Sequence, residues 1–183
     1  SLTLWCISAY HFHQHRESFL PERMGRAVNS ELQRQENIFD EFIKDEDLVR
    51  RMFSDSLTQQ ETEQIVGYPF FVFAYEEDSL LAWNTNTIIA GDKDTLTDTA
   101  LILRNEKGVF IERVIGIPDS NSSKRIVVLF PVVITYPLEN DYLKSHFVAS
   151  SYIPIQTQVI AKDKYVSGDY PIFMHENIPV CYL

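Results

Sequence analysis

Side chains that could bind a small molecule gather where a predicted hairpin turns from apolar to polar. Residues 70–75 are aromatic, β-branched or small, and a second apolar run ends at Trp83. Asn84 and Asn86 follow within three positions, so an aromatic ring and two amides meet at one junction. Ligand pockets combine apolar walls with a few such polar groups, which makes this junction a candidate site. A core tryptophan followed by ordinary turn residues is the alternative interpretation.

Two arginines form a second candidate site. Arg104 and Arg113 fall on neighbouring predicted strands, 100–104 and 108–115, which a turn at 105–108 joins. Two guanidinium groups on adjacent strands would clamp an anionic ligand through charge-assisted hydrogen bonds. Separate exposure of the two side chains to solvent is the alternative.

We expect neither a metal nor a cofactor. His11, His13 and His15 alternate along the chain and would share one face of an extended segment, where they could ligate a metal. They precede a charged helix, where polar residues are common in any case, and we favour that explanation. An acidic loop begins at Asp92 but lacks the glycine and the glutamate of an EF-hand, because Thr97 and Leu103 occupy those positions.

The chain carries no signature of a common enzyme class. It contains no P-loop, GxGxxG, HExxH or GxSxG motif, so we expect no catalytic activity in these residues. The formal charge of −10 argues against nucleic acid as a partner, since nucleic acids require clustered lysine and arginine. Cys6 and Cys181 have neither the spacing of a zinc site nor that of a disulfide framework.

Hydrophobic spacing predicts the helices that must position these groups. Apolar residues three, four or seven positions apart predict one long helix over 16–53, with a kink or a fresh start near Pro21. Ser56 and Gln59 have the spacing of a capping box and predict a second, shorter helix over 56–65.

Five strands follow the two helices. The first two form a hairpin with a four-residue connection at 76–79, and Pro131 predicts a bulge or an edge position, because proline cannot donate to a ladder. A short helix opened by proline is expected over 137–144. The predicted strands cover 70–75, 80–83, 100–104, 108–115 and 125–135. Helices before strands indicate an α+β fold, in which a long N-terminal helix and a short helix pack on a central five-stranded antiparallel sheet.

One domain accounts for most of the chain. A length of 183 residues with a hydrophobic share of 45% suits a single globular unit. Residues 1–12 carry no charged side chain, whereas charges are dense from Arg16 onward. This contrast is typical of the trailing end of a transmembrane helix, with a short buried segment of the domain as the alternative. We therefore divide the chain into a transmembrane or juxtamembrane end, 1–15, and one domain, 16–183.

Two segments resemble a known family. The first is Asp78-Ser79-Leu80 followed by Trp83 and Asn86, and the second is Tyr136-Pro137-Leu138-Glu139-Asn140-Asp141-Tyr142-Leu143-Lys144-Ser145-His146-Phe147. Both are similar to segments of the extracytoplasmic sensor regions of Bacteroidetes-type membrane sensor histidine kinases. An apolar start that leads through residues 10–16 into a long helix is similar to that family as well.

The resemblance implies a periplasmic, signal-sensing domain of an inner-membrane, two-component histidine kinase. Such domains are PAS-like, of the Cache or PDC type, and the kinase core would lie outside these residues. A small ligand of unknown identity would bind over the face of the sheet opposite the long helix, near the hairpin junction and the second segment. A homodimer would form through the N-terminal helix. The alternative is a ligand-free protein-interaction or dimerisation module of a membrane receptor. Candidate ligand-binding residues are Trp83, Asn84, Asn86, Arg104, Arg113, Tyr136, Asn140 and Tyr142.

Overall fold

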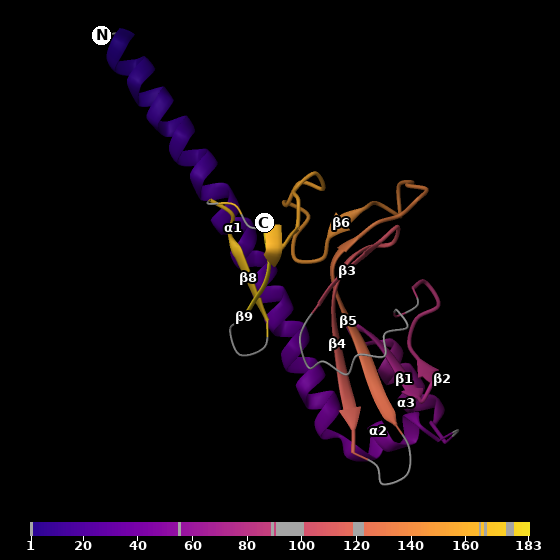
Figure 1. The fold of residues 1–183 in the computed structure, drawn as a ribbon. Helices are drawn as coiled ribbons and strands as arrows, with labels where there is room; N and C mark the ends of the chain where they lie inside the picture. Colours follow the sequence, from indigo (N-terminus) through magenta and orange to yellow (C-terminus); the bar gives the residue numbers. More distant parts are fainter. Residues whose placement is uncertain are drawn as a thin grey trace.

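The chain has an α+β fold in which helices precede an antiparallel sheet (Figure 1). The computed structural model describes residues 2–54, 56–88, 90, 101–118, 123–164, 166, 168–174 and 178–183. In these residues three α-helices are followed by a six-stranded sheet and a smaller three-stranded sheet. The predicted class and the antiparallel sheet are therefore confirmed.

The predicted long helix is two helices. Helix α1 (Leu2–Lys44) includes Pro21 and continues past it without ending. Helix α2 (Glu46–Met52) starts afresh because Asp45 caps it, and the Asp45 carboxylate accepts a hydrogen bond of 3.0 Å from the Leu48 N–H. A side chain that satisfies an orphan N–H of a new first turn favours a helix start at that point.

The cap of the next helix also differs from the prediction. Helix α3 (Gln59–Val66) is capped by Thr58, whose side chain accepts from the Glu61 N–H while the Glu61 carboxylate accepts from the Thr58 N–H. The capping box therefore joins Thr58 and Glu61, two positions later than the predicted pair of Ser56 and Gln59. Both pairs have the same spacing, but only Glu61 accepts a hydrogen bond from the backbone N–H of the capping residue, Thr58.

Five strands of the main sheet lie in the order β2-β1-β5-β4-β3, and the short strand β6 pairs with the far end of β5. The first hairpin turns through only two residues, Glu77 and Asp78, and Glu77 has a positive φ of 53°. The predicted four-residue connection was therefore too long. The strands are β1 (Phe71–Glu76), β2 (Ser79–Trp83), β3 (Leu101–Asn105), β4 (Gly108–Ile117), β5 (Lys124–Ile134) and β6 (His146–Phe147).

Pro131 lies in β5, which is an interior strand and not an edge. It faces Phe110 of β4 beside a register shift, because Val109 pairs with Val133 and Phe110 pairs with Pro131. Val132 is the extra residue, so the predicted bulge is present on β5 itself, next to the proline. On the other side of β5, pairing with β1 ends at Leu129 and pairing with β6 begins at Val133. Proline therefore occupies a position where the sheet has an interruption on each side.

Buried side chains cover both faces of the sheet. On one face Phe39 of α1 meets Phe70 and Phe130 in edge-to-face contacts, with ring centroids 5.4 and 5.5 Å apart. On the other face Phe73 and Phe110 pack with Ile88, which follows β2 in the chain. Apolar contact on both sides explains why β1 is apolar on both faces.

A second, C-terminal sheet packs against α1. It contains β7 (Ile160–Ala161), β8 (Pro171–Met174) and β9 (Ile178–Tyr182), in the order β7-β9-β8. The Asn29 side chain donates to the Pro171 carbonyl at 3.2 Å and accepts from the Phe173 N–H at 2.8 Å. Gly25 permits this approach, because a Cβ atom at that position would overlap the Tyr170 ring.

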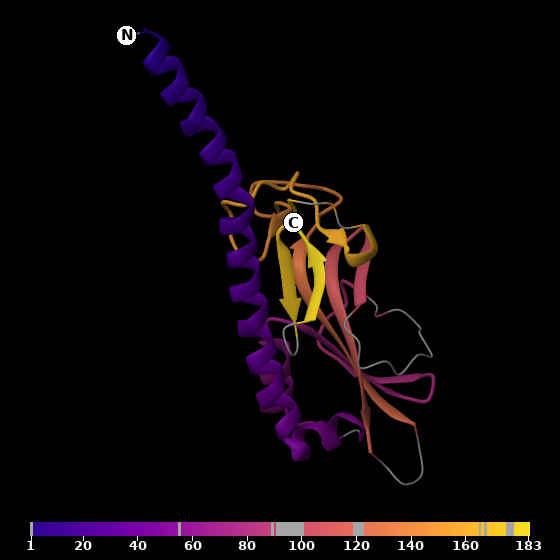
Figure 2. The same cartoon turned by 60° about the vertical axis from the view of Figure 1, so that its left-hand side comes forward.

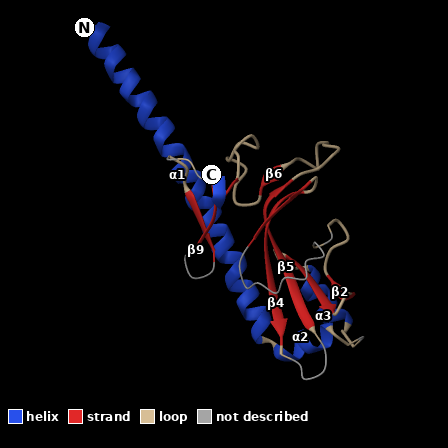
Figure 3. Cartoon of the chain, in the orientation of Figure 1, coloured by secondary structure: helices blue, strands red, loops and turns tan. Residues whose placement is uncertain are grey.

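The two ends of the molecule differ. The N-terminal part of α1 projects beyond the sheets, and the loops around 136–145 and 148–159 and the C-terminus lie at the end from which it projects (Figures 1 and 2). Helices α2 and α3 lie at the opposite end (Figure 3). Within the described part of the chain, no helix combines the length and the apolar character that a membrane crossing requires.

Candidate ligand-binding site

The hairpin junction is built around Asn84, whose side chain is fully engaged by backbone groups. Its Oδ1 accepts from the Val72 N–H at 2.9 Å, and its Nδ2 donates to the Ile65 and Phe70 carbonyls at 3.0 and 2.9 Å. Asn84 thus connects the end of α3 to the start of β1. A side-chain amide with these three partners stabilises the fold and retains little capacity for a ligand.

Trp83 and Asn86 interact with each other. Trp83 is 48% exposed, and its indole N–H donates to the Asn86 Oδ1 at 2.7 Å. The ring borders a hollow of about 530 Å³ between β2 and the chain around Phe53 and Leu57. The hollow has no charged residue in its lining, so it offers apolar surface and little means of orienting a polar ligand.

The predicted arginine clamp does not form, because Arg104 and Arg113 occupy different environments. Arg113 is buried beside Glu36, with nitrogen and oxygen 3.5 Å apart, and its guanidinium lies 5.8 Å from the centre of the Phe39 ring. Arg104 is exposed and faces Val109 across the β3–β4 ladder. Val109 and Arg113 are four residues apart along β4, which is about 13 Å.

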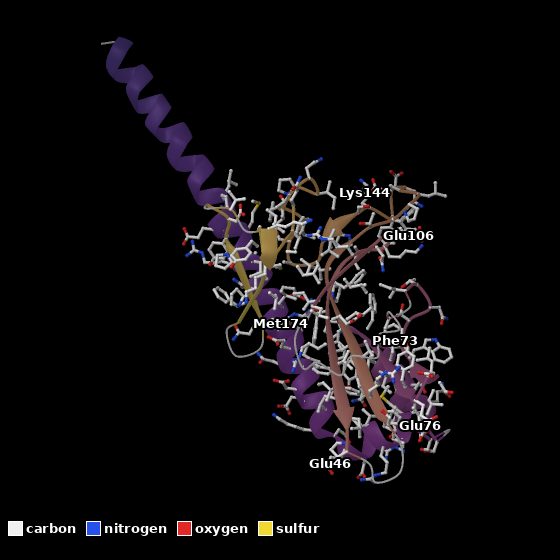
Figure 4. All side chains as sticks on the ribbon, viewed as in Figure 1. Glu46, Phe73, Glu76, Glu106, Lys144 and Met174 are labelled. Carbon is white, nitrogen blue, oxygen red and sulfur yellow. The ribbon has the colours of Figure 1, made fainter. Side chains whose placement is uncertain are left out.

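Arg104 instead lines an open pocket of about 400 Å³ at the end of the sheet from which α1 projects. The pocket lies between the ends of β3, β4 and β5 and the loops that follow β5 and β6. In Figure 4 the labels Glu106, in the β3–β4 turn, and Lys144 mark this end of the molecule. We call it the Arg104–Glu139 pocket. Its lining residues are Arg104, Val109, Val133, Thr135, Glu139, Ser145, Ile155, Gln156, Thr157, Gln158 and Val159.

Glu139 supplies a fixed negative charge to this pocket. Its Oε1 accepts a hydrogen bond of 2.9 Å from the Ser145 N–H. The Ser145 hydroxyl accepts from the Tyr136 N–H at 3.1 Å, which leaves its proton free to point at the carboxylate. The hydroxyl and the N–H of Ser145 lower the pKa of Glu139, because both stabilise the ionised form.

Residues 137–144 form a loop that positions Glu139, in place of the predicted helix. The Asn140 side chain accepts from the N–H groups of Tyr142 and Leu143, both at 2.8 Å. Asparagine bonded to its own following backbone offers an alternative to helical hydrogen bonds, and here that alternative prevails. Tyr136 contributes only its backbone N–H, which donates to the Ser145 hydroxyl, and the Tyr142 side chain is 95% exposed.

The positive charge of Arg104 has no counter-ion among the described residues. No hydrogen bond or ion pair joins its side chain to any of them, and it forms no ion pair with Glu139 across the pocket. The pocket therefore holds two opposite charges that do not neutralise each other directly. Both charges border the same hollow of about 400 Å³.

The pocket wall also contacts α1. The Thr157 hydroxyl lies 4.0 Å from the Met24 sulfur, and Val159 is buried in the same apolar cluster as Val28 and Leu32. A change in the 155–159 segment would consequently alter the packing of α1.

A second cavity, of about 700 Å³, lies at the opposite end beside α2. Its lining is mostly apolar, and its two cations already have partners. Arg50 pairs with Asp47 at 2.8 Å, and Lys124 pairs with Glu76 at 3.8 Å. This cavity is larger, but among its described lining residues the only charge without an ion-pair partner is the carboxylate of Glu46, so it does not offer free charges of both signs.

No metal or nucleophile is evident near the pocket. In the described residues no three histidine, cysteine or acidic side chains come together as a metal site would require, and the histidines at 11, 13 and 15 fall outside the described side chains. Cys181 is buried in β9, and desolvation raises the pKa of its thiol to about 12 despite the nearby charge of Arg104. The thiol stays protonated and is a poor nucleophile.

The sequence interpretation identified part of this pocket. It named Arg104 and the loop that contains Glu139, but it omitted Glu139 itself, Ser145, Gln156 and Gln158. The alternating polar residues Gln156 and Gln158 beside apolar Ile155 and Val159 were the available signal. The structure does not bring Trp83 to the pocket. Trp83 pairs with Phe73, and Phe73 pairs with Val127 of β5. The pocket loop leaves β5 at Ile134, which is seven residues, or about 23 Å, further along the strand.

The fold and the pocket define an α+β domain with an antiparallel sheet and a loop-bordered polar site. No protein-family model, no curated protein and no solved structure matches the chain.

Proposed function

We propose that the chain is the periplasmic sensing domain of an inner-membrane sensor histidine kinase, of the PAS-like Cache type, and that it binds a small ligand in the Arg104–Glu139 pocket. The observation that carries the proposal is that the pocket wall contacts α1 through Thr157 and Met24. The sequence resemblance of the hairpin and of residues 136–147 to such sensor domains supports the same conclusion.

The mechanism is a shift between two positions of α1. A ligand that contacts residues 155–159 binds one arrangement of this segment better than the other, and the difference in affinity biases the equilibrium. A bias from 1:99 to 99:1 requires roughly a 10⁴-fold difference in affinity. Residues 1–15 form the end of a membrane span in this proposal, so a displacement of α1 reaches the membrane and a partner subunit in a homodimer.

The PAS-like arrangement is part of the proposal. It is supported by the apolar contacts between α1 and the sheet, centred on Phe39, and by the antiparallel order of five strands. In such an arrangement the helix covers one face of the sheet and connects the sensing region to the membrane.

The complete gene tests the class of protein. We expect apolar spans of about 20 residues on both sides of the chain, followed by a kinase core with a phosphoacceptor histidine. A reading frame without these segments would contradict the proposal.

Ligand screening tests the sensing function. The 183-residue protein is heated with a panel of amino acids, dicarboxylates, sugars, purines and quaternary amines, and its melting temperature is recorded. A true ligand at 100 times its Kd stabilises the folded state by about 2.7 kcal/mol. If no compound raises the melting temperature, direct sensing of a small molecule is excluded for that panel and loses its main support.

A distance measurement tests the coupling to α1. Spin labels at Glu22 on α1 and Lys107 in the β3–β4 turn report the position of the helix relative to the sheet. We expect ligand to change this distance distribution and to leave a control pair within the sheet, Glu77 and Lys107, unchanged. Equal changes in both pairs, or none, would contradict the proposed shift.

One observation favours the alternative, a ligand-free interaction module. Leu138, Tyr142 and Tyr152 are 85%, 95% and 92% exposed at the end of the molecule that contains the pocket. Exposed apolar side chains of this size are typical of a protein contact surface. Self-association is compatible with both functions, because the proposed sensor is also a homodimer. Calorimetry with small molecules separates them: the proposed sensor binds a small ligand in the pocket, whereas an interaction module binds none.

A further inference from the structure

We propose that the Arg104–Glu139 pocket binds a zwitterion of amino-acid size, with the ligand carboxylate toward Arg104 and the ligand ammonium toward Glu139. This inference rests on the proposed sensing function and specifies its ligand class. It follows from the charges, the neutral polar groups and the dimensions of the pocket.

The two charges are arranged for a ligand that carries both signs. Arg104 is permanently charged and has no hydrogen-bond or ion-pair partner among the described residues. Glu139 is held ionised by Ser145, which engages its Oε1. A bound molecule that carries both signs can form a charge-assisted hydrogen bond with each of them.

The remaining lining suits the middle of such a molecule. Gln156 and Gln158 each supply a carbonyl oxygen and an amide NH₂, and Thr135 supplies a hydroxyl. Val109 and Val133 form an apolar surface from β4 and β5, where an aliphatic side chain of the ligand would pack. The cavity of about 400 Å³ lies within the roughly 300–1,000 Å³ range of small-molecule sites.

Charge also decides against the other ligand classes. A dicarboxylate would place a negative group against Glu139, and a diamine would place a positive group against Arg104. A neutral sugar would leave both charges without a counter-ion and would gain no charge-assisted hydrogen bond between groups of opposite sign. Specificity of this kind comes from repulsion of the wrong ligands as well as attraction of the right one.

The first experiment uses the ligand as the variable. Isothermal titration calorimetry measures the Kd of the 183-residue protein for each of the twenty free amino acids. The tightest binder is then compared with its N-acetyl derivative, which lacks the ammonium, and with its carboxamide, which lacks the carboxylate. We expect each derivative to bind roughly 10- to 100-fold more weakly, as for loss of a charged hydrogen bond.

The second experiment changes the protein. Arg104→Gln and Glu139→Gln remove one charge each with little change in side-chain length, and we expect each to weaken the amino acid by roughly 10- to 100-fold. Arg26→Gln and Glu41→Gln are matched controls, because Arg26 and Glu41 are exposed on α1 and do not line the pocket. The urea midpoint of each variant verifies that it remains folded.

Each outcome decides one question. Amino-acid binding that survives both pocket substitutions would overturn the assigned site. A dicarboxylate, diamine or sugar that binds in place of amino acids, with loss in the Arg104 or Glu139 variant, would overturn the zwitterion but retain the sensing function. If no amino acid and no compound of the wider panel binds, both the inference and the proposed function are overturned.

Discussion

The hairpin junction and the Arg104–Glu139 pocket present polar groups at opposite ends of the same sheet, yet only the pocket has binding capacity left. At the junction the Asn84 amide already makes three hydrogen bonds to backbone groups. In the pocket Arg104 has no partner among the described residues, and Glu139 is held in place by one neighbour, Ser145. The sequence therefore indicates polar side chains in both regions. Only the hydrogen bonds in the structure show which side chains are used by the fold and which are available to a ligand.

The two arginines repeat this contrast within one sheet. Arg113 is buried with Glu36 and the Phe39 ring, whereas Arg104 is exposed at the pocket. We expect the three substitutions below to test the contrast through the free energy of unfolding, measured by urea denaturation.

The largest effect is expected for Arg113→Gln. The change removes the positive partner of Glu36, whose side chain is only 14% exposed, and breaking a buried pair in this way costs about 3–5 kcal/mol. Arg104→Gln is the matched control and should change stability by less than about 0.5 kcal/mol. Equal urea midpoints for the two variants would show that burial does not distinguish these arginines.

Asn84→Ala should have the next largest effect. It leaves the Val72 N–H and the Ile65 and Phe70 carbonyls without their side-chain partner, and an unsatisfied buried group costs about 1–3 kcal/mol. Because the site is partly accessible to water, we expect a total of about 2 kcal/mol. Ligand affinity at the pocket should stay unchanged, and a loss of affinity equal to that of Glu139→Gln would contradict the separation of the two regions.

Tyr142→Ser should have the smallest effect. The tyrosine lies in the pocket loop but is 95% exposed, so stability should change by less than about 0.5 kcal/mol and ligand affinity by less than twofold. Calorimetry with the ligand identified by screening would detect a larger change, which would mean that the ring covers the pocket when ligand is bound.

Local patterns predicted the buried face of α1 but not its exceptions. Among the apolar residues at helical spacing, Val28, Leu32, Phe39 and Phe42 are buried, whereas Leu20 is 52% exposed. Gln35 interrupts the stripe and is nevertheless buried, because its Nε2 donates to the Pro131 carbonyl at 3.4 Å. Its partner is 96 residues away, so no local pattern could reveal it.

The candidate site was predictable only in part for the same reason. Arg104, Glu139 and Gln156 come from separate regions of the chain, and the pairing of β3, β4 and β5 brings those regions together. Residues 137–144 have a proline in a position that favours a helix start, but the Asn140 side chain bonds the following backbone and keeps the segment a loop. Such competition between local structures is decided by tertiary contacts.

The contact between Asn29 and Pro171 also has a consequence for biosynthesis. The two residues are 142 positions apart, and synthesis at about 5–20 residues per second separates their appearance by roughly 7 to 28 seconds. During that interval the part of α1 that β8 will cover has no partner from the C-terminal sheet. The nascent chain must therefore keep this part of the helix from aggregating until almost all of the domain has left the ribosome.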